Sequence, residues 1–530
     1  MQRNKQLANL KEGQFDILVI GGGATGAGIA LDAASRGLQV ALVERLDFAA
    51  GTSSRSTKLV HGGVRYLEQA MKRLDRGQYH LVKEALHERA ILLKLAPHLT
   101  HPLPILTPLY KWHEIVYYHI GLKLYDLLAG RHNLKPSRFV SAKRVMEMFP
   151  MLKREGLKGA VLYYDGQFND ARMNLSIALT ALKQGAVVAN YVRVQNLIKN
   201  DAGKLCGVRA KDEINGVEFD IYAKAIINAT GPFVDEIRKI DEPEVSPMLQ
   251  VSSGIHVVLD KRFCAPDTGV LIPKTDDGRV LFLLPWLGHT LVGTTDNPAK
   301  VEVDPQASEE DVHYLLKYIN RYYDLKISRE DVLASWSGLR PLVSVADSKE
   351  TAKLSRDHVI RVSASGLITI TGGKWTTYRK MALDAVNQAI QLAQLQPARF
   401  SQTEKIPFVG AEGFHAKLPY ELAEEFKLDF DIAQHLANSY GGLAREVLTS
   451  TGAYLWRRLV PGHPYLEAEI LYAIREEGAC HVMDILSRRM RLAFLDRKAT
   501  LAVLPRVIDL VGDALGWDPK RRHKEFQIMA

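Results

Sequence analysis

The sequence predicts an α/β protein with a doubly wound sheet, a further antiparallel sheet and a C-terminal all-helical domain. Three observations support this prediction. A strand–glycine–helix pattern opens the chain and recurs near Gly372, alternating apolar stretches lie between residues 250 and 300, and helical periodicity replaces strand signals after about residue 400. The composition agrees, because 47% hydrophobic and 24% charged residues over 530 positions exclude a disordered or collagen-like chain.

The N-terminal region carries the clearest local pattern. The run FDILVI at residues 15–20 is nearly continuously apolar, which is typical of a buried parallel strand. Three glycines follow, residues 24–36 have the pattern of a helix, and LQVALV at residues 38–43 has the pattern of a second buried strand. We therefore expect a β-α-β unit here, at the start of a doubly wound domain.

The later elements follow from the same criteria. Residues 71–95 have helical periodicity, and the four prolines between residues 97 and 108 then favour an extended chain. Strands are expected at Ala225–Ala229 and within residues 250–300, and residues 367–393 repeat the strand–glycine–helix pattern. Helices are expected at residues 417–450, 464–495 and 499–516.

The glycines after the first strand form the pattern Gly21-x-Gly23-x-x-Gly26, which is typical of a dinucleotide site. The first glycine makes a tight turn, the second lets a pyrophosphate approach the backbone, and the third permits close helix–strand packing. The pyrophosphate is expected at the helix N-terminus, where free N–H groups and the helix dipole favour negative charge. Glu44 ends the second strand, where a carboxylate accepts hydrogen bonds from a ribose diol and repels a 2′-phosphate. The predicted ligand is FAD or NAD, not NADP.

Two further turns favour FAD over NAD. The segment IINATG at residues 226–231 is a strand that ends in a small-residue turn at Gly231, and another strand–glycine–helix unit lies at Gly372 and Gly373. A single NAD-binding domain needs neither turn. Segments that converge on one ligand from distant parts of the chain suit the extended FAD of a flavoprotein.

Longer motifs resemble those of a known family. They are GTSSRSTKLVHGGVRY at residues 51–66, NATGP at 228–232, GTTD at 293–296, SGLRPL at 337–342 and GGKWTTYRK at 372–380. Together with the helical C-terminal region, they resemble the FAD-dependent glycerol-3-phosphate dehydrogenases, which belong to the D-amino-acid-oxidase-like flavoproteins.

The resemblance implies a domain organisation. Residues 1–400 would hold an FAD-binding Rossmann-like doubly wound domain and an interleaved antiparallel-sheet substrate domain. The FAD segments would be about 15–70, 160–235 and 340–395, the substrate segments about 75–155 and 245–335, and the C-terminal helical domain 401–530.

The resemblance also implies a reaction. In it, sn-glycerol 3-phosphate loses a hydride from C2 to flavin N5 and a proton from its C2 hydroxyl, which gives dihydroxyacetone phosphate. The electrons then pass to a membrane quinone. The alternative within the family is a glycerol-3-phosphate oxidase, which passes the electrons to oxygen and releases hydrogen peroxide.

The substrate carries a phosphate dianion, so its site needs fixed cations, and the arginine fork matches phosphate oxygens bidentately. By position in the family motifs, the substrate-binding candidates are Arg65, Tyr66, Arg340, Arg356 and Lys374. For each arginine, a surface salt bridge is the ordinary alternative.

The catalytic candidates implied by the resemblance are His256, Arg340 and Lys374. His256 is expected to be the base for the C2 hydroxyl or to position that hydroxyl, and the alternative is a hydrogen-bonded strand histidine. Arg340 is a candidate to stabilise the developing alkoxide. Lys374 and the amides of the helix after Gly373 would stabilise negative charge on the reduced flavin.

The cofactor-binding candidates combine the glycine fingerprint with polar residues near it. Thr52, Ser53 and Ser54 follow the Glu44 strand and are candidates to bond the flavin phosphates or ribityl chain, whereas Lys58 and His61 on the same stretch receive no firm role. The full set is Gly21, Gly23, Gly26, Glu44, Thr52, Ser53, Ser54, Gly231, Gly373 and Lys374.

The net charge of +9 suits an anionic substrate, an anionic membrane surface or nucleic acid. No apolar run reaches the ~20 residues of a membrane-spanning helix, and the polar N-terminus has no pattern of a secretory signal. Aromatic and cationic residues between Tyr110 and Tyr125 suit a membrane interface or an ordinary packed helix, and Arg488, Arg489 and Arg491 suit anionic lipid or a charged helix face. With the family, this predicts a cytoplasmic enzyme bound peripherally to the cytoplasmic membrane.

Other readings remain to be weighed against this one. A flavin-binding RNA-modifying protein is supported by the basic charge alone, and we expect no nucleic-acid partner. A non-catalytic flavin scaffold would have no use for the arginines. The three scattered cysteines predict neither a disulfide framework nor a metal site, and a homodimer is compatible with the sequence but not indicated by it.

Overall fold

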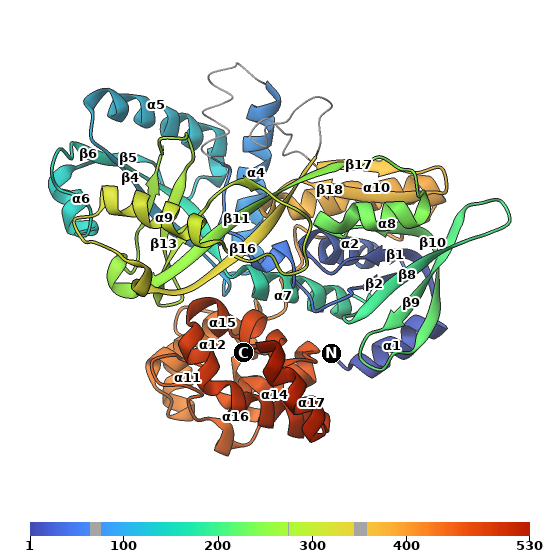
Figure 1. Cartoon of the computed structure of the whole chain (residues 1–530). Helices are drawn as coiled ribbons and strands as arrows, with labels where there is room; N and C mark the ends of the chain where they lie inside the picture. Colours follow the sequence, from blue (N-terminus) through green and yellow to red (C-terminus); the bar gives the residue numbers. More distant parts are fainter. Residues whose placement is uncertain (64–75, 274, 344–357, 530) are drawn as a thin grey trace.

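The computed structural model describes residues 1–63, 76–273, 275–343 and 358–529. It shows two sheets side by side, with a bundle of C-terminal helices beneath them (Figure 1). The predicted fold class is confirmed in each of its three parts, and the division at about residue 400 stays a proposal.

The first sheet is the doubly wound sheet that the sequence predicts. Within the described residues it runs in the order β17-β18-β10-β1-β2-β7, and β9 and β8 extend it from β10. The pairs β18–β10, β10–β1, β1–β2 and β2–β7 are parallel, and Ile20 at the end of β1 lies opposite Asn228 and Val43. The strands are β1 (Gln14–Ile20), β2 (Val40–Val43), β7 (Val187–Ala189), β8 (Val192–Lys199), β9 (Leu205–Asp212), β10 (Glu218–Asn228), β17 (His358–Val362) and β18 (Leu367–Gly372). The carboxyl ends of β1, β2, β10 and β18 therefore meet at one edge, which is where the predicted glycine turns lie.

Both faces of this sheet are covered, as the apolar runs of its strands require. Ile17 and Val19 of β1 pack with α2 (Ala24–Ser35), α7 (Asp170–Lys183) and α10 (Tyr378–Ala393). Leu18 and Ile20 point to the other face, which β8, β9, α1 (Arg3–Glu12) and α8 (Val234–Asp241) cover. Each fully buried aliphatic side chain contributes about 1.5–3 kcal/mol to this packing.

The second sheet is mainly antiparallel. Within the described residues its main order is β15-β11-β14-β13-β12-β4-β6-β3, with β16 on β11 and β5 on β6, and the pair β12–β4 is parallel. The strands are β3 (Leu59–Val60), β4 (Thr100–Leu109), β5 (Arg138–Ser141), β6 (Gly159–Phe168), β11 (Leu249–Asp260), β12 (Gly269–Ile272), β13 (Leu281–Trp286), β14 (His289–Gly293), β15 (Asn297–Pro298) and β16 (Val332–Val343). The long β11–β16 register puts His256 opposite Trp336 and Ser252 opposite Arg340, so this pair of strands carries two predicted catalytic residues.

The proline-rich segment after the first long helix is the strand β4, as its extended pattern predicts. Pro102, Pro104 and Pro108 are an even number of residues apart, so their backbone nitrogens face the same side of β4. The strand pairs with β6 along its whole length and with β12 only at Ile105 and Leu106. Proline cannot donate a backbone hydrogen bond, and it is tolerated here because few such bonds form on the side of β4 that faces β12.

Four helices surround the second sheet. They are α4 (Arg76–Leu95), α5 (Trp112–Ala129), α6 (Ala142–Met148) and α9 (Glu309–Tyr322). The helix α4 agrees with the helix predicted for residues 71–95, of which 71–75 lie outside the described residues. In the part of the chain that the structure describes, no helix is long and apolar enough to cross a membrane.

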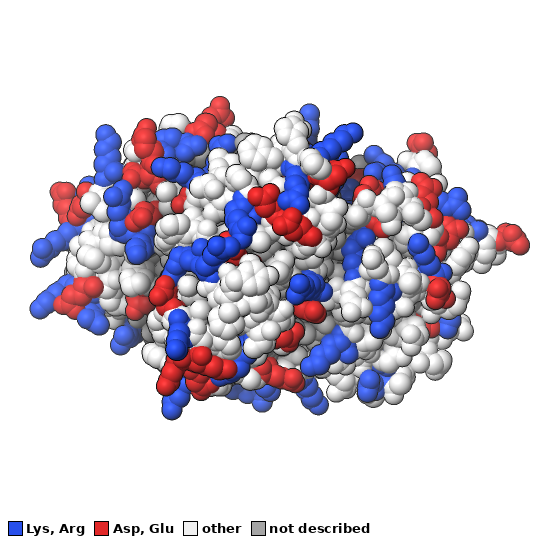
Figure 2. All heavy atoms as spheres, turned by 90° about the horizontal axis from the view of Figure 1, so that it is seen from below, with Lys and Arg blue, Asp and Glu red and all other residues white. Residues whose placement is uncertain are grey.

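The C-terminal region is mainly helical, and its apolar core continues into the second sheet through Val258, Trp286, Leu291 and Trp336. Its elements are α11 (Leu418–Phe426), α12 (Phe430–Tyr440), α13 (Ala444–Thr449), α14 (Glu467–Glu477), a π-helical turn (Asp484–Arg489), α15 (Leu492–Leu495), α16 (Arg497–Leu515) and α17 (Pro519–Met529). The three helical stretches predicted from the sequence are confirmed. On the face seen from below, where these helices lie, basic and acidic side chains are interspersed and form no continuous basic band (Figure 2).

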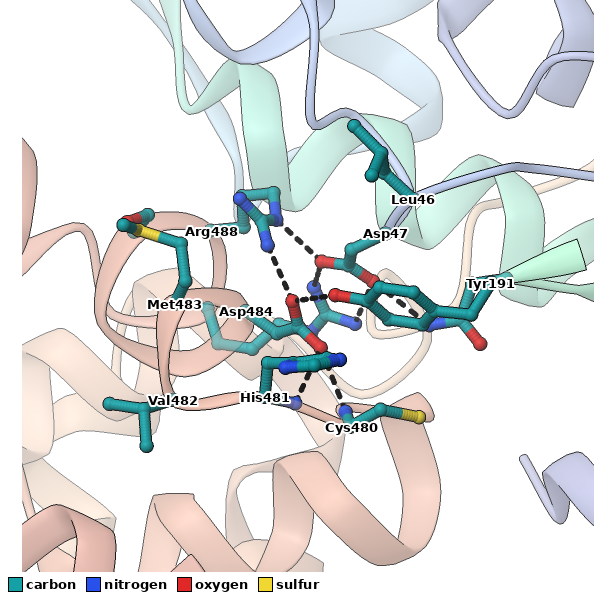
Figure 3. Close-up of polar contacts among 12 residues, drawn as sticks. Leu46, Asp47, Tyr191, Cys480, His481, Val482, Met483, Asp484 and Arg488 are labelled. Atoms are coloured by element: carbon teal, nitrogen blue, oxygen red, sulfur yellow. Dashed lines mark hydrogen bonds and ion pairs between the residues drawn. The ribbon is translucent and has the colours of Figure 1, made fainter. Parts of the chain in front are cut away.

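Buried ion pairs join this helical domain to the first sheet (Figure 3). Asp47, just after β2, accepts hydrogen bonds from Arg488 Nε at 2.6 Å and from Arg489 Nη1 at 2.5 Å. Asp484 accepts from Arg488 Nη2 at 2.5 Å and from the Tyr191 hydroxyl at 2.6 Å. Burial alone would raise the pKa of Asp47, but Arg489 and Arg488 lower that pKa to about 2.

The expectation that Arg488, Arg489 and Arg491 contact lipid is wrong. All three side chains are buried, and Arg489 is 2% exposed. Arg491 Nη2 donates to the Ser54 carbonyl at 2.7 Å, and burial lowers the pKa of its guanidinium to about 10. These arginines hold two domains together, because a buried guanidinium needs a carboxylate or carbonyl partner.

Candidate active site

The glycine fingerprint forms a tight turn between β1 and α2. Gly21 has a φ of +111°, a conformation that only glycine adopts readily. A Cβ atom at Gly26 would lie 1.8 Å from the Gly21 carbonyl oxygen, so the third glycine allows the helix to begin directly against the turn. Ser53 Oγ accepts a hydrogen bond from the Ala24 N–H at 2.9 Å, which places this hydroxyl at the N-terminus of α2.

Glu44 lies directly after β2, beside the same turn. Its carboxylate accepts hydrogen bonds from the N–H groups of Gly22 at 2.6 Å and Leu46 at 2.8 Å. Burial raises the pKa of Glu44, and the two backbone donors oppose that rise. The carboxylate is thus fixed at the edge of the sheet where a ribose is expected.

A cavity of about 500 Å³ opens at this edge. Eight of the ten predicted cofactor residues line it: Gly21, Gly23, Glu44, Thr52, Ser53, Gly231, Gly373 and Lys374. Gly26 does not line the cavity, because it packs against the Gly21 carbonyl where α2 meets the glycine turn. Ser54 is buried outside the lining, and its carbonyl accepts a hydrogen bond from Lys58 Nζ at 2.8 Å.

The cavity fits a long dinucleotide on three sides. Gly231 lies at its rim with a φ of +60°, and Gly372 and Gly373 have φ values of +82° and +68°. A Cβ atom at Gly373 would lie 2.5 Å from Met381 Sδ, so the backbone here has room only without a side chain. Together with the fingerprint turn and Glu44, these residues would hold the pyrophosphate, the ribose and the flavin end of FAD.

A second cavity of about 320 Å³ adjoins the first. Thr52, Pro341, Gly373, Lys374 and Trp375 line both cavities, so a molecule in the second would meet the flavin end of the first. Four cationic side chains line the second cavity, and they are Arg55, Arg279, Arg340 and Lys374. Asp296 is the one carboxylate among the described residues of this lining. Arg55 and Arg279 are also paired, with Asp304 at 2.7 Å and with Asp277 at 3.1 Å, so the arginines of this cavity are held in place by carboxylates. Guanidinium groups fixed in this way suit an anionic substrate.

Arg340, a residue of β16, is held firmly in the second cavity. Its guanidinium donates to Asp296 Oδ1 and Thr294 Oγ1, each at 3.0 Å, and to the Thr295 carbonyl at 3.1 Å. A Cβ atom at Gly254 would lie 2.2 Å from Arg340 Nη2, so this glycine on β11 leaves room for the side chain.

His256 lies on β11 with its ring in the wall of the same cavity. Nε2 is 3.0 Å from Thr57 Oγ1, and the ring stacks on Trp336 with centroids 4.2 Å apart and planes at 21°. Burial, the charge of Lys58 and the charge of Arg340 together hold the pKa of His256 well below its ordinary value of 6.5. The imidazole is therefore neutral near pH 7, which a base must be.

Lys374 begins the short 3-10 helix Trp375–Thr377, which leads into α10, and it lines both cavities. This is the position expected for a cation at the junction of flavin and substrate. The predicted substrate residues Arg65, Tyr66 and Arg356 lie outside the described residues.

Three residues of this site were not predicted from the sequence. Arg55 and Arg279 line the second cavity, and Thr57 bonds His256. Arg55 and Thr57 lie within the motif at residues 51–66, so their place in that motif was the available clue, whereas Arg279 lies in a turn between strands with no motif of its own. In the described part of the chain, no group of three or more histidine, cysteine or acidic residues is arranged to hold a metal ion.

Comparisons with known proteins give the same answer as this geometry. Residues 16–379 match the family described as FAD dependent oxidoreductase, and residues 401–522 match the C-terminal domain of alpha-glycerophosphate oxidase. The mitochondrial glycerol-3-phosphate dehydrogenase of Rattus norvegicus is 50% identical over 539 residues, covering 99% of this chain and 74% of that protein. This chain belongs to the FAD-dependent glycerol-3-phosphate dehydrogenases. The resemblance inferred from the motifs and FAD as the cofactor are thereby confirmed.

Other relatives of the dehydrogenase agree. The mitochondrial glycerol-3-phosphate dehydrogenase SDP6 of Arabidopsis thaliana is 45% identical over 99% of this chain and 87% of its own length. The crystal structure of the glycerol-3-phosphate dehydrogenase from Bacillus halodurans, complexed with FAD, has a TM-score of 0.80 and 32% identity, covering 100% of this chain and 96% of that one. The L-alpha-glycerophosphate oxidase of Mycoplasma pneumoniae shares only the fold, with a TM-score of 0.55 and 18% identity over 72% of this chain and 96% of that one.

Proposed function

We propose that this enzyme oxidises sn-glycerol 3-phosphate to dihydroxyacetone phosphate by hydride transfer from C2 to flavin N5, and that a membrane quinone receives the electrons. The observation that carries the substrate assignment is the cationic cavity, which holds four basic side chains and adjoins the flavin end of the FAD cavity. Its size of about 320 Å³ suits a small phosphorylated molecule.

The protein's residues divide the chemistry as follows. Arg55, Arg279 and Lys374 bind the phosphate, because it is a dianion and they line the cavity. Arg340 lies close enough to His256 to lower the pKa of that ring, so it is placed to stabilise the alkoxide that forms at C2. FAD, when bound, accepts the hydride.

The proton of the C2 hydroxyl takes a separate route. Thr57 and His256 both line the cavity, and Thr57 Oγ1 is 3.0 Å from His256 Nε2. The Thr57 hydroxyl accepts the substrate proton as it passes its own proton to Nε2, and His256 becomes the imidazolium. The low pKa of His256 then favours release of that proton once the product has formed.

The substrate assignment is tested by an anaerobic titration of the holoprotein with glycerol 3-phosphate, following the absorbance of oxidised flavin. Bleaching is expected with glycerol 3-phosphate and not with glycerol or a D-amino acid, because the cations act on the phosphate. A yellow protein that glycerol 3-phosphate does not bleach would contradict the assignment.

The acceptor is tested separately from the substrate. Two mitochondrial relatives that match 99% of this chain are named dehydrogenases, which favours the quinone over oxygen. We expect a short-chain quinone to reoxidise the reduced flavin at least ten times faster than air-saturated buffer. Rapid oxygen uptake with release of peroxide would identify an oxidase instead.

We further propose that the outer face of α5 contacts the cytoplasmic membrane. Trp112, Val116, Ile120 and Leu127 are spaced along one face of this helix and are exposed, with Trp112 at 65% and Leu127 at 74%. The opposite face is packed, since the Tyr125 hydroxyl accepts from the Gly62 N–H at 2.7 Å. Tyr125 is thus packed as in an ordinary helix, whereas Trp112 is exposed and would contact the membrane.

The neighbourhood of this face favours an anionic bilayer. Lys111 precedes the helix and Lys123 lies on it, which complements acidic headgroups. The double variant Trp112→Ser and Ile120→Ser is expected to lose at least tenfold in co-sedimentation with phosphatidylglycerol vesicles. The matched control is Phe400→Ser with Tyr454→Ser, since these residues are 91% and 73% exposed elsewhere. Equal binding by both double variants would place the contact on another surface.

A further inference from the structure

A buried lysine lies just behind the wall of the substrate cavity. The Lys58 side chain is 0% exposed, and its Nζ donates to Asp170 Oδ2 at 2.6 Å and to the Ser54 carbonyl at 2.8 Å. Its backbone φ is +63°, a conformation that a residue with a side chain adopts only when its surroundings hold it there. A buried ammonium in a strained backbone conformation is costly to stability, which calls for an explanation in terms of function.

Lys58 lies beside the aromatic stack that carries His256. Nζ is 4.5 Å from the centre of the Trp336 ring, and Trp336 stacks on the imidazole of His256. Thr57, the preceding residue, bonds His256 Nε2. One short segment therefore fixes the atom that receives the proton and also places a positive charge against the indole on which the ring rests.

We propose that Lys58 is a positioning residue of the proposed reaction, which fixes the Trp336–His256 stack and keeps the imidazole in its neutral, proton-accepting form. The inference rests on the proposed function, since it assigns Lys58 a role toward the base of that reaction. Lys58 itself does not line either cavity and does not touch the substrate.

The charges around His256 give the direction of the effect. Among the described residues, two cations face it, Lys58 from the segment before β3 and Arg340 from β16, and their counter-ions are Asp170 and Asp296. Burial lowers the pKa of His256 most, and the two cations lower it further. Removing the charge of Lys58 therefore raises the pKa of His256, and the imidazole then takes up a proton at a higher pH than before.

Lys58 carries its charge over the range of pH that matters. Burial lowers its pKa to about 7, although Asp170 opposes that change. Below about pH 7 the ammonium of Lys58 is charged. The cation is therefore present in the acidic range, where protonation of the imidazole would stop His256 from acting as a base.

Loss of the ammonium costs stability, because the pair is buried, but Asp170 keeps other donors. Asp170 also accepts hydrogen bonds from the Ser56 N–H at 3.0 Å, the Ser56 hydroxyl at 2.7 Å and the Ala171 N–H at 2.8 Å. Arg491 Nη2 lies 3.6 Å from its other oxygen. The carboxylate thus keeps several donors in Lys58→Met, whose side chain has nearly the volume of lysine, and the holoprotein is expected to retain FAD.

The test compares Lys58→Met, Lys58→Arg and the wild type by the pH dependence of anaerobic flavin reduction with glycerol 3-phosphate. The acid limb of the profile is expected to move up by about one pH unit in Lys58→Met, and to return toward the wild-type position in Lys58→Arg, which restores a cation. The matched control is Lys183→Met, because Lys183 is 65% exposed and paired with Glu412 on the surface. An acid limb that stays in place in Lys58→Met would overturn the proposal.

A second measurement does not depend on the substrate. In wild-type protein labelled with carbon-13 at histidine, the resonance of His256 is identified by its loss in His256→Gln. It is expected to stay at the neutral position to a lower pH in the wild type than in Lys58→Met. An imidazole of His256 that titrates near its ordinary pKa would refute the role of Lys58. Failure of glycerol 3-phosphate to bleach the wild-type flavin would contradict the proposed function instead, and this resonance would still report on Lys58.

Discussion

Replacing Asp47 with asparagine removes one negative charge from the junction between the first sheet and the helical domain. Asparagine has the shape of aspartate, so the perturbation is electrostatic. It leaves Arg488 and Arg489 without the carboxylate that both of them share, and Arg489 is 2% exposed. A buried guanidinium that loses its partner cannot recover the missing interaction from water.

The structure gives two magnitudes for this loss. The pKa of Asp47 falls from an ordinary 3.8 to about 2 on folding, which corresponds to about 2 kcal/mol of stability. That contribution is present above about pH 4 and is lost as the pH falls through about 2. Breaking a buried pair costs more, about 3–5 kcal/mol, because the arginines are stranded as well. The unfolding entropy of a 530-residue chain is about 1.1 kcal/mol per kelvin, so we expect the thermal midpoint of Asp47→Asn to fall by about 3–5 °C near pH 7.

The assay is thermal denaturation of the holoprotein, followed by near-ultraviolet circular dichroism under identical conditions. The matched control is Asp513→Asn, since Asp513 pairs with Arg522 at 2.7 Å but is 76% exposed. An exposed pair contributes at most about 1 kcal/mol, so the midpoint of the control is expected to move by no more than about 1 °C. Equal midpoints for the two variants would refute the reasoning that burial makes the Asp47 pairs strong.

Two further predictions concern the cavities. Gly26→Ala is expected to abolish retention of FAD, because its Cβ atom would lie 1.8 Å from the Gly21 carbonyl oxygen. The flavin-to-protein absorbance ratio measures this retention, and Gly121→Ala, where the new Cβ atom would meet open space, is the control. A Gly26→Ala protein that binds FAD stoichiometrically would rule out the fingerprint as the cofactor turn. Arg340→Ala is expected to lower kcat/KM by about 10- to 100-fold with FAD still bound, as the loss of one charged hydrogen bond implies. Steady-state kinetics check this against Arg262→Ala, an exposed ion pair, and unaltered kinetics would remove Arg340 from the site.

The sequence was sufficient wherever a local pattern decides the structure. The β1 strand, the glycine turn and the α2 helix follow from apolar runs and glycines within about thirty residues, which short-range sterics and hydrogen bonding determine. The helix α1 was not predicted, because its sequence RNKQLANLKE has a polar pattern. It is stabilised by distant contacts, such as the ion pair of Arg3 with Asp212 at 2.6 Å and the burial of Leu7 and Leu10.

The same limit explains the wrong expectation for the three arginines near residue 490. A run of basic residues suggests an exposed surface when nothing in its vicinity can neutralise it. The partner of Arg489 is Asp47, which is 442 positions away in the chain. Long-range charge pairing leaves no trace in a local window. Arg279 was missed because the packing of distant strands, and not a local motif, brings it to the substrate cavity.

The junction also explains why the helical domain matters to the active site. The segment that joins β2 to β3 carries Glu44 toward the FAD cavity and Thr57 toward the substrate cavity. Between these two residues, the helical domain contacts the segment at two points. Asp47 accepts a hydrogen bond from Arg489, and the Ser54 carbonyl accepts one from Arg491 at 2.7 Å. By fixing this segment, the helical domain stabilises both binding sites. In Asp47→Asn these contacts are weakened, so we expect FAD to dissociate at the temperature at which the junction opens. Release of FAD in a separate transition at a higher temperature would contradict this link.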